Sequence, residues 1–271
     1  RMKTRIISGA VFTAVLALVF FLLPNFVTAI SVAALCAMAS YELLYATGLV
    51  KNIRLNIYSA LMAALVTVWS YFGCAYGPML LGIQIYAMLL FGELLITSGK
   101  TPVAQLSYCL LSGLVIPFLL SALLRVRNDV NGTTLLLIPF IMAYCSDTGA
   151  YFIGVCFGKH KMCPNISPKK SWEGFFGGIC VAIIGMLVYA LVLDHAADYD
   201  VKYYLVVLYG LVGALGSVYG DLMMSVIKRQ VGIKDYGNLI PGHGGILDRF
   251  DSVLITAPLT EALLLLIPMV V

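Results

Sequence analysis

Residues 203–227 have the sequence YYLVVLYGLVGALGSVYGDLMMSVI, an apolar run that contains a single charged residue, Asp221. A helix needs about 20 mostly apolar residues to cross a bilayer. Runs of similar length recur along the whole chain, so we expect an all-α, polytopic integral membrane protein with about nine transmembrane helices. The other eight runs cover residues 6–23, 26–49, 55–72, 79–96, 103–124, 134–156, 175–193 and 253–271.

The overall composition supports the same fold class. Of the 271 residues, 61% are hydrophobic and 11% are charged, whereas soluble domains have roughly 25% charged residues. No composition shift divides the chain, so we expect one membrane domain over residues 1–271. The net charge of +4 is too small to indicate a nucleic-acid partner and is compatible with contact to anionic membrane lipids. The seven cysteines include no Cys-x-x-Cys pair, which argues against a zinc site.

The basic residues predict the orientation, because lysine and arginine collect in cytoplasmic loops. With nine spans and a cytoplasmic N-terminus, all but three of the 17 basic residues fall on the inner side. The exceptions are Arg125, Arg127 and Lys202. The run 6–23 could pass for a signal peptide, but the apolar run that follows favours a retained first helix. We therefore expect a protein of the bacterial inner membrane type, with its polar segments facing the cytoplasm.

Acidic residues within apolar runs are informative, because a carboxylate in lipid is costly without a partner. Asp221, Ser225 and Lys228 have i, i+4 and i+7 spacing, which places them on one face of a helix. Asp248 and Asp251 have i, i+3 spacing at the start of the last run. Magnesium favours a few carboxylates together with substrate phosphates, so Asp221, Asp248 and Asp251 form a candidate metal site. The acids inside or at the edge of apolar runs are Glu42, Glu93, Asp147, Asp221, Asp248, Asp251 and Glu261.

A glycine-rich segment lies between these acids and is flanked by cations. Residues 240–245 are IPGHGG, and glycine lets the backbone present its N–H groups closely to a phosphate. Together with the acids, the segment is a candidate pocket for a polyphosphate and a metal ion within residues 144–251. Lysines at an inner boundary can also be orientation signals, and Glu42, Glu93 or Glu261 could pair structurally. The cations near the segment are Lys228, Arg229, Lys234 and Arg249, with Lys169 and Lys170 in a second inner loop.

Residues 225–251 resemble the signature of the phosphatidate cytidylyltransferases. The matching residues are SVIKR at 225–229, KD at 234–235, PGHGG at 241–245, DR at 248–249, and Asp251. The upstream segments SDTGAY at 146–151 and SPKKS at 167–171 are also similar to that family, whereas the first five spans match it only in character. The resemblance implies transfer of a cytidylyl group from CTP to phosphatidic acid in phospholipid biosynthesis, giving CDP-diacylglycerol and pyrophosphate. It also implies a magnesium requirement and a homodimer.

Our hypothesis for the site assigns three roles. Metal binding is assigned to Asp221, Asp248 and Asp251. Catalysis is assigned to Lys228, Arg229, Lys169, Asp248 and Asp251. Substrate binding is assigned to Lys170, Ser225, Lys234, Gly242, His243, Gly244, Gly245, Arg249 and Asp147. Two alternatives stay open: a CTP-dependent lipid kinase of the polyprenol type, which would transfer the γ-phosphoryl group, and a transporter whose buried acids mark an ion path.

Overall fold

Long apolar helices make up most of the computed structural model, which describes residues 9, 11, 13–73, 75–129, 131–197, 199–239, 242 and 244–270. Within this part of the chain, seven helices are long and apolar enough to cross a membrane. The first and last predicted runs correspond to shorter apolar helices, Thr13–Leu22 and Val253–Leu266. The all-α polytopic fold is confirmed, and the count of nine spans is not. The seven long helices are Asn25–Ala46, Ile53–Tyr71, Tyr76–Ile96, Val103–Arg127, Gly132–Phe157, Trp172–Ala197 and Tyr203–Val231.

Backbone contacts divide the chain into two units. The N-terminal unit comprises Arg1–Thr133 with Val231–Phe250, and the C-terminal unit comprises Thr134–Gln230 with Asp251–Val271. The predicted signature region, residues 144–251, contributes to both units. Each unit is therefore described by itself.

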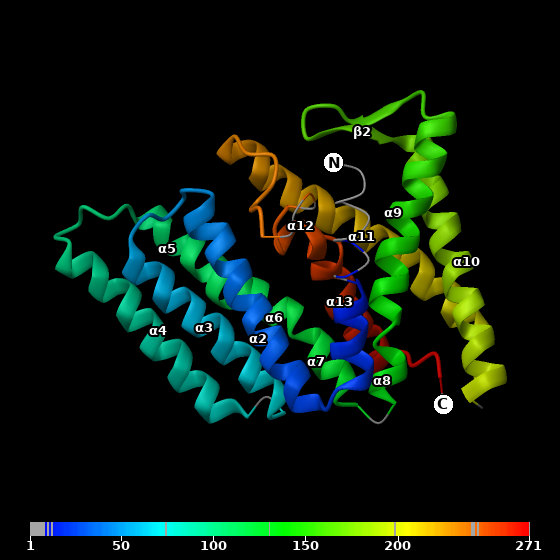
Figure 1. Ribbon diagram of the computed structural model, residues 1–271, viewed down its shortest axis with the longest axis horizontal. Helices are drawn as coiled ribbons and strands as arrows, with labels where there is room; N and C mark the ends of the chain where they lie inside the picture. The colour runs from blue at the N-terminus through cyan, green and yellow to red at the C-terminus, as the bar shows by residue number, and fades with distance from the viewer. Residues whose placement is uncertain are drawn as a thin grey trace. The chain divides into compact units, whose positions relative to one another are not determined.

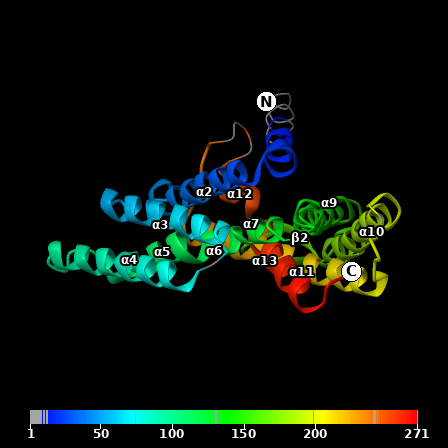
Figure 2. The ribbon, with the colours of Figure 1, turned by 90° about the horizontal axis from the view of Figure 1, so that it is seen from below.

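In the N-terminal unit, α3 packs against both α2 and α4 (Figure 2). Two of its spans contain a turn of π-helix, a feature that is rare and often lies near functional sites. The elements are η1 (Leu18–Leu22), α2 (Asn25–Tyr41), η2 (Glu42–Ala46), α3 (Ile53–Tyr71), α4 (Tyr76–Ile96), α5 (Val103–Leu110), η3 (Leu111–Val115), α6 (Ile116–Leu120), α7 (Ala122–Arg127) and the short α12 (Leu247–Phe250).

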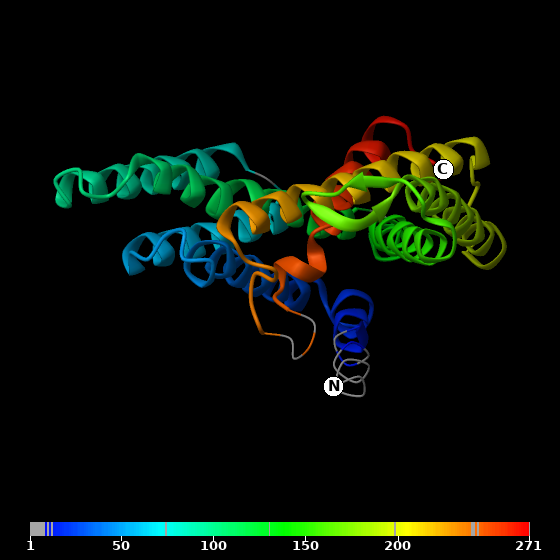
Figure 3. The same ribbon diagram turned by 90° about the horizontal axis from the view of Figure 1, so that it is seen from above.

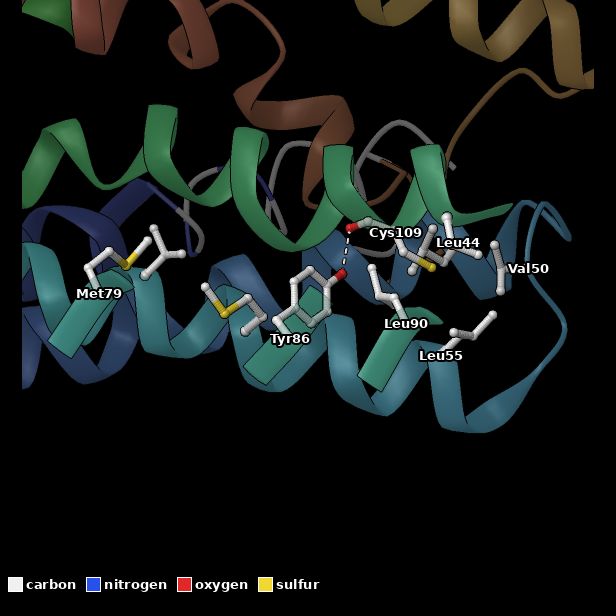
Figure 4. Packing of buried hydrophobic residues seen from close by; sticks show 10 residues of the cluster. Leu44, Val50, Leu55, Met79, Tyr86, Leu90 and Cys109 are labelled. Atoms are coloured by element: carbon white, nitrogen blue, oxygen red, sulfur yellow. Dashed lines mark hydrogen bonds between the residues drawn. The ribbon is translucent and has the colours of Figure 1, made fainter. Parts of the chain in front are cut away.

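The core of this unit contains a polar link between helices. The Tyr86 hydroxyl donates to the Cys109 carbonyl over 2.8 Å, as Figure 4 shows, and lies 2.9 Å from the Ser59 hydroxyl. A Cβ atom at Gly113 would lie 2.6 Å from the Tyr86 hydroxyl, so only glycine leaves room for this contact. The surrounding buried residues are Leu44, Val50, Leu55, Met62, Val66, Met79, Leu90 and Leu106.

Arg127, one of the exceptions to the charge pattern, has a structural role in this unit. Its guanidinium group donates to the carbonyls of Val19, Phe20 and Leu23, and the side chain is 5% exposed. These carbonyls lie at the C-terminal end of η1, where backbone oxygens have no partner within the helix. Because Arg127 satisfies them, its position does not report on the orientation of the loop.

The C-terminal unit is a group of helices with a short hairpin. Figure 1 shows α9 and α10 side by side, with the hairpin joining them at one end. The short α8 (Gly132–Leu135) leads into the unit. The elements are α9 (Ile138–Phe157), β1 (Lys161–Cys163), β2 (Ser167–Ser171), α10 (Trp172–Ala197), α11 (Tyr203–Val231) and α13 (Val253–Leu266).

Small residues allow the helices of this unit to approach closely, as is common between membrane helices. A Cβ atom on Gly149 of α9 would lie 2.6 Å from the Cβ of Val181 in α10. A Cβ atom on Gly220 of α11 would lie 2.5 Å from the carbonyl oxygen of Asp251. The backbones therefore touch where polar side chains from different helices meet.

The hairpin is a difference from the purely helical prediction. β1 and β2 pair antiparallel, and in the view of Figure 3 the hairpin overlaps α11. The turn between them contains Pro164 and Asn165, two residues that favour turns because proline fixes φ and asparagine bonds its own backbone. The hairpin places Lys169 and Lys170 on its second strand.

Candidate active site

Two acids of the C-terminal unit are held by neighbouring hydroxyl groups. Asp147, in the middle of α9, accepts hydrogen bonds from the Ser217 hydroxyl at 3.2 Å and the Ser252 hydroxyl at 3.0 Å. Asp221 of α11 accepts from the Ser225 hydroxyl at 3.1 Å. This last bond shows that Asp221 and Ser225 lie on one face of α11, as their spacing predicts.

Two lysines lie among these acids. Lys170 Nζ, on β2, is 2.6 Å from Asp221 Oδ2, and the two side chains are only 21% and 27% exposed. Lys228, one further turn along α11 from Ser225, is 8% exposed and interacts electrostatically with Asp251. Such half-buried ion pairs are screened less by solvent than surface pairs.

The acids also act on one another. Burial raises the pKa of the Asp251 carboxyl, the nearby charge of Asp221 raises this pKa further, and Lys228 lowers it. Asp147 also interacts with Asp221 and with Lys170. Three acids share this region with the buried Lys228 and the partly buried Lys170, so the region favours an added cation. Even so, in the described parts of the chain no three acidic, histidine or cysteine side chains gather closely enough to form a ready metal site.

A cavity of about 200 Å³ opens beside this group of acids and lysines. Typical pockets for drug-sized ligands have roughly 300–1,000 Å³, so this cavity has room for only part of a substrate, such as a phosphate group. Lys169, which is exposed, contributes a further cation to its wall. Its lining includes Asp147, Tyr151, Lys169, Lys170, Phe175 and Asp221.

The glycine-rich segment belongs to the N-terminal unit, where Asp248 shapes it. Asp248 Oδ2 accepts hydrogen bonds from the backbone N–H of Tyr236 at 2.8 Å and of Gly245 at 3.0 Å. Gly242 and Gly244 have φ values of +78° and +85°, which residues other than glycine rarely adopt. The glycines are thus required by the backbone conformation of the loop.

The start of the last apolar run differs from the prediction. Asp248 and Asp251 were expected one turn apart on a single helix. In the structure Asp248 lies in α12, whereas Asp251 lies in the turn between α12 and α13. The Asp251 side chain accepts a hydrogen bond from the Ser252 N–H at 2.8 Å, which is local bonding of the kind that competes with a continuous helix.

The other predicted site residues occupy different surroundings. Arg229 donates through Nε to the Ile166 carbonyl at 3.1 Å, so it joins α11 to the hairpin turn. Lys234 is exposed and Arg249 is partly buried, both in the N-terminal unit. His243 lies outside the described residues. The structure brings together Asp147, Lys169, Lys170, Asp221, Ser225, Lys228 and Asp251 in one unit, and Lys234, Gly242, Gly244, Gly245, Asp248 and Arg249 belong to the other.

Sequence reasoning did not identify Ser217 and Ser252 as members of the site. Ser217 has i, i+4 spacing to Asp221 and could have been found as the next residue on the same helix face. Ser252 directly follows Asp251, but nothing in its local pattern indicates a bond to Asp147, which is 105 residues away.

Comparisons with known proteins give a consistent result. A family model described as the cytidylyltransferase family matches residues 3–267. A phosphatidate cytidylyltransferase of Bacillus subtilis is 32% identical over 274 residues, which covers 98% of each chain. Phosphatidate cytidylyltransferases of Haemophilus influenzae and Mycobacterium tuberculosis are 38% and 41% identical over 168 and 138 residues. These matches cover 59% and 51% of this chain, and 57% and 40% of the relatives.

Proposed function

The chain belongs to the cytidylyltransferase family, and we propose that it transfers the cytidylyl group of CTP to phosphatidic acid, giving CDP-diacylglycerol and pyrophosphate. It is an integral membrane enzyme of phospholipid biosynthesis. The single observation that carries this function is the match to a phosphatidate cytidylyltransferase over nearly the whole length of both chains.

The chemistry requires the site to bring anions together. A phosphate oxygen of phosphatidic acid attacks the α-phosphorus of CTP, the bond between the α-phosphorus and the bridging oxygen breaks, and pyrophosphate leaves. The lipid phosphate is ionised at neutral pH, so the site must mainly position and neutralise charge. We assign the neutralisation of phosphate oxygens to Lys169 and Lys170, which line the cavity, and to Lys228 on α11.

Magnesium is the cofactor that we propose, with Asp221 and Asp251 as its ligands in the C-terminal unit; Asp248, the third acid of the sequence hypothesis, belongs to the N-terminal unit. The hard carboxylate oxygens suit this ion, and the mutual repulsion of Asp221 and Asp251 favours a cation beside them. When bound, the ion would supply charge neutralisation for the phosphates. Neighbouring groups orient the two proposed ligands: the Ser225 hydroxyl donates to Asp221, and the Ser252 backbone N–H donates to Asp251.

The proposal also includes the orientation of the protein in the membrane and its oligomeric state. The distribution of basic residues supports an active site that faces the cytoplasm, where CTP is available. The resemblance of the signature to the family supports a homodimer, which light scattering in detergent can test.

The decisive test uses purified protein, phosphatidic acid and CTP that carries radiolabel at a chosen phosphorus. Label at the α-position should enter the lipid product, whereas label at the γ-position should leave with pyrophosphate. Chelation by EDTA should stop the reaction and added magnesium should restore it. Transfer of γ-label to a lipid would instead identify a lipid kinase, and no transfer of either label would contradict the proposal.

A further inference from the structure

Glu42 is a buried acid in the N-terminal unit that has no assigned role in the reaction. It begins the π-helical turn η2 at the end of α2 and is 4% exposed. Its Oε1 accepts the backbone N–H of Ile246 at 2.8 Å, and its Oε2 accepts the N–H of Leu247 at 2.9 Å. One carboxylate therefore satisfies two consecutive backbone donors more than 200 residues away in sequence.

The glycines of the signature leave the space that this carboxylate occupies. A Cβ atom on Gly245 would lie 2.4 Å from Glu42 Oε1, and one on Gly237 would lie 2.8 Å from the same oxygen. Real Cβ atoms essentially never come this close to another atom, so either glycine could gain a side chain only if Glu42 moved. Gly245 has no positive φ, so the carboxylate, and not the backbone angle, explains glycine at this position.

The Glu42 contact lies next to the bonds that Asp248 makes. Glu42 holds residues 246 and 247, and Asp248 follows directly, accepting the N–H groups of Tyr236 and Gly245. Glu42 also contributes to the wall of a cavity of about 350 Å³ whose other polar residues are Tyr41, Asp235, Tyr236 and Asn238. The segment that Glu42 holds thus leads directly into Asp248 at the start of α12, and Glu42 itself lines the cavity.

We propose that Glu42 is a positioning residue for the reaction, whose two carboxylate oxygens fix the backbone of Gly245–Leu247 and thereby the orientation of Asp248. This inference rests on the proposed cytidylyl transfer. A carboxylate suits the task because both of its oxygens accept and each can take a separate N–H. The two backbone donors satisfy both oxygens of this buried side chain, which offsets part of the cost of burying it.

The first experiment replaces the acceptor without changing its shape. In Glu42→Gln one oxygen becomes an NH₂ group, which faces a backbone N–H and cannot accept from it. We expect kcat, per folded enzyme and at saturating CTP and phosphatidic acid, to fall at least about tenfold, equivalent to about 1.4 kcal/mol. Glu93→Gln is the matched control, because Glu93 is also buried, at 3% exposure, and accepts from Asn52 at 2.8 Å in the same unit. Its kcat should stay within about twofold of the wild type.

The second experiment tests the contact itself with a double-mutant cycle. Gly245→Ala should lower kcat strongly in the wild-type background, because the added methyl group collides with Glu42. In a Glu42→Ala background, where the carboxylate is gone, the same change should cost several times less. This non-additivity is the mark of direct coupling. Equal costs in both backgrounds would contradict the contact.

Hydrogen exchange separates a failure of this inference from a failure of the proposed function. In Glu42→Gln the amides of Ile246 and Leu247 should exchange faster, whereas peptides from α3 and α4 should exchange as in the wild type. This readout needs no substrate. Faster exchange with an unchanged kcat would reduce Glu42 to a structural residue, and unchanged exchange would overturn the proposed bonding. Absence of α-label transfer by the wild-type enzyme would contradict the function and leave the exchange result standing.

Discussion

Asp221 makes several direct electrostatic contacts within the C-terminal unit. It pairs with Lys170 at 2.6 Å, accepts from Ser225, and acts on the carboxyls of Asp147 and Asp251. The Asp221 carboxylate therefore neutralises part of the charge of Lys170 and also fixes the position of the Lys170 side chain. The ion pair with Lys170 joins the hairpin to α11, so the lysine that we assign to phosphate is held beside the proposed metal ligand.

The Asp221→Asn variant tests this assignment. An amide keeps the shape but is a much poorer magnesium ligand and loses the ion pair with Lys170. We expect kcat to fall about 100-fold or more, a magnitude typical for loss of a group that organises charge at a reaction centre, while the protein still elutes as a folded species in detergent. Asp194→Asn is the control, since Asp194 lies at the far end of α10 and bonds Tyr203. Activity of Asp221→Asn close to that of Asp194→Asn would contradict the role in catalysis.

At this scale the sequence predicted which residues of α11 share one helix face, but not the partners of the acids. Asp221, Ser225 and Lys228 were found because α-helical spacing is local and places them on one face. The bonds of Asp147 to Ser252, and of Glu42 to Ile246, join residues more than 100 positions apart. No local pattern encodes such pairs, because they depend on how the helices pack.

At the scale of the elements, α9 and α10 make a close contact within the C-terminal unit. The Cβ of Val181 lies where a Cβ on Gly149 would have to be, at 2.6 Å. Valine is stiff at χ1, so the neighbour cannot move aside easily. Apolar periodicity predicted both helices, but it gave no reason for glycine at 149. The hairpin between them was missed because its signal, Pro164-Asn165, is a turn within a short polar segment.

We expect Gly149→Ala to separate the two helices and lower the free energy of unfolding by about 1–3 kcal/mol, the usual cost of overpacking. Gly92→Ala in α4 is the control, because a Cβ there meets nothing within 4 Å and alanine favours the helix. Thermal unfolding in detergent should therefore show a lower midpoint for Gly149→Ala and an equal or higher midpoint for Gly92→Ala. Equal midpoints for the two variants would show that the helix contact tolerates a methyl group.

At the scale of the whole molecule, the orientation of the loops is independent of whether seven or nine helices cross the membrane. Successive helices that cross a membrane must run in opposite directions, so the loops between the seven long helices alternate in side whatever Thr13–Leu22 and Val253–Leu266 do. A change in the count therefore alters only the side on which the chain ends lie. Hydropathy predicted the seven long helices because their apolar runs exceed the bilayer thickness. Within the described residues, Thr13–Leu22 and Val253–Leu266 are too short for the same argument to decide.

Single cysteines in a background without the native cysteines can determine the orientation. With the active site in the cytoplasm, cysteines at Lys100 and Lys161 should react with a membrane-impermeant thiol reagent only in inverted vesicles. Cysteines at Gly77 and Asp200 should react in intact cells. All four positions are exposed. Gly77 and Lys100 lie at opposite ends of α4, and Lys161 and Asp200 lie on opposite sides of α10. Each unit therefore contains its own internal control. Labelling on the opposite sides would place the Lys170 and Asp221 pair away from the compartment that holds CTP, and would contradict the orientation that the basic residues predict.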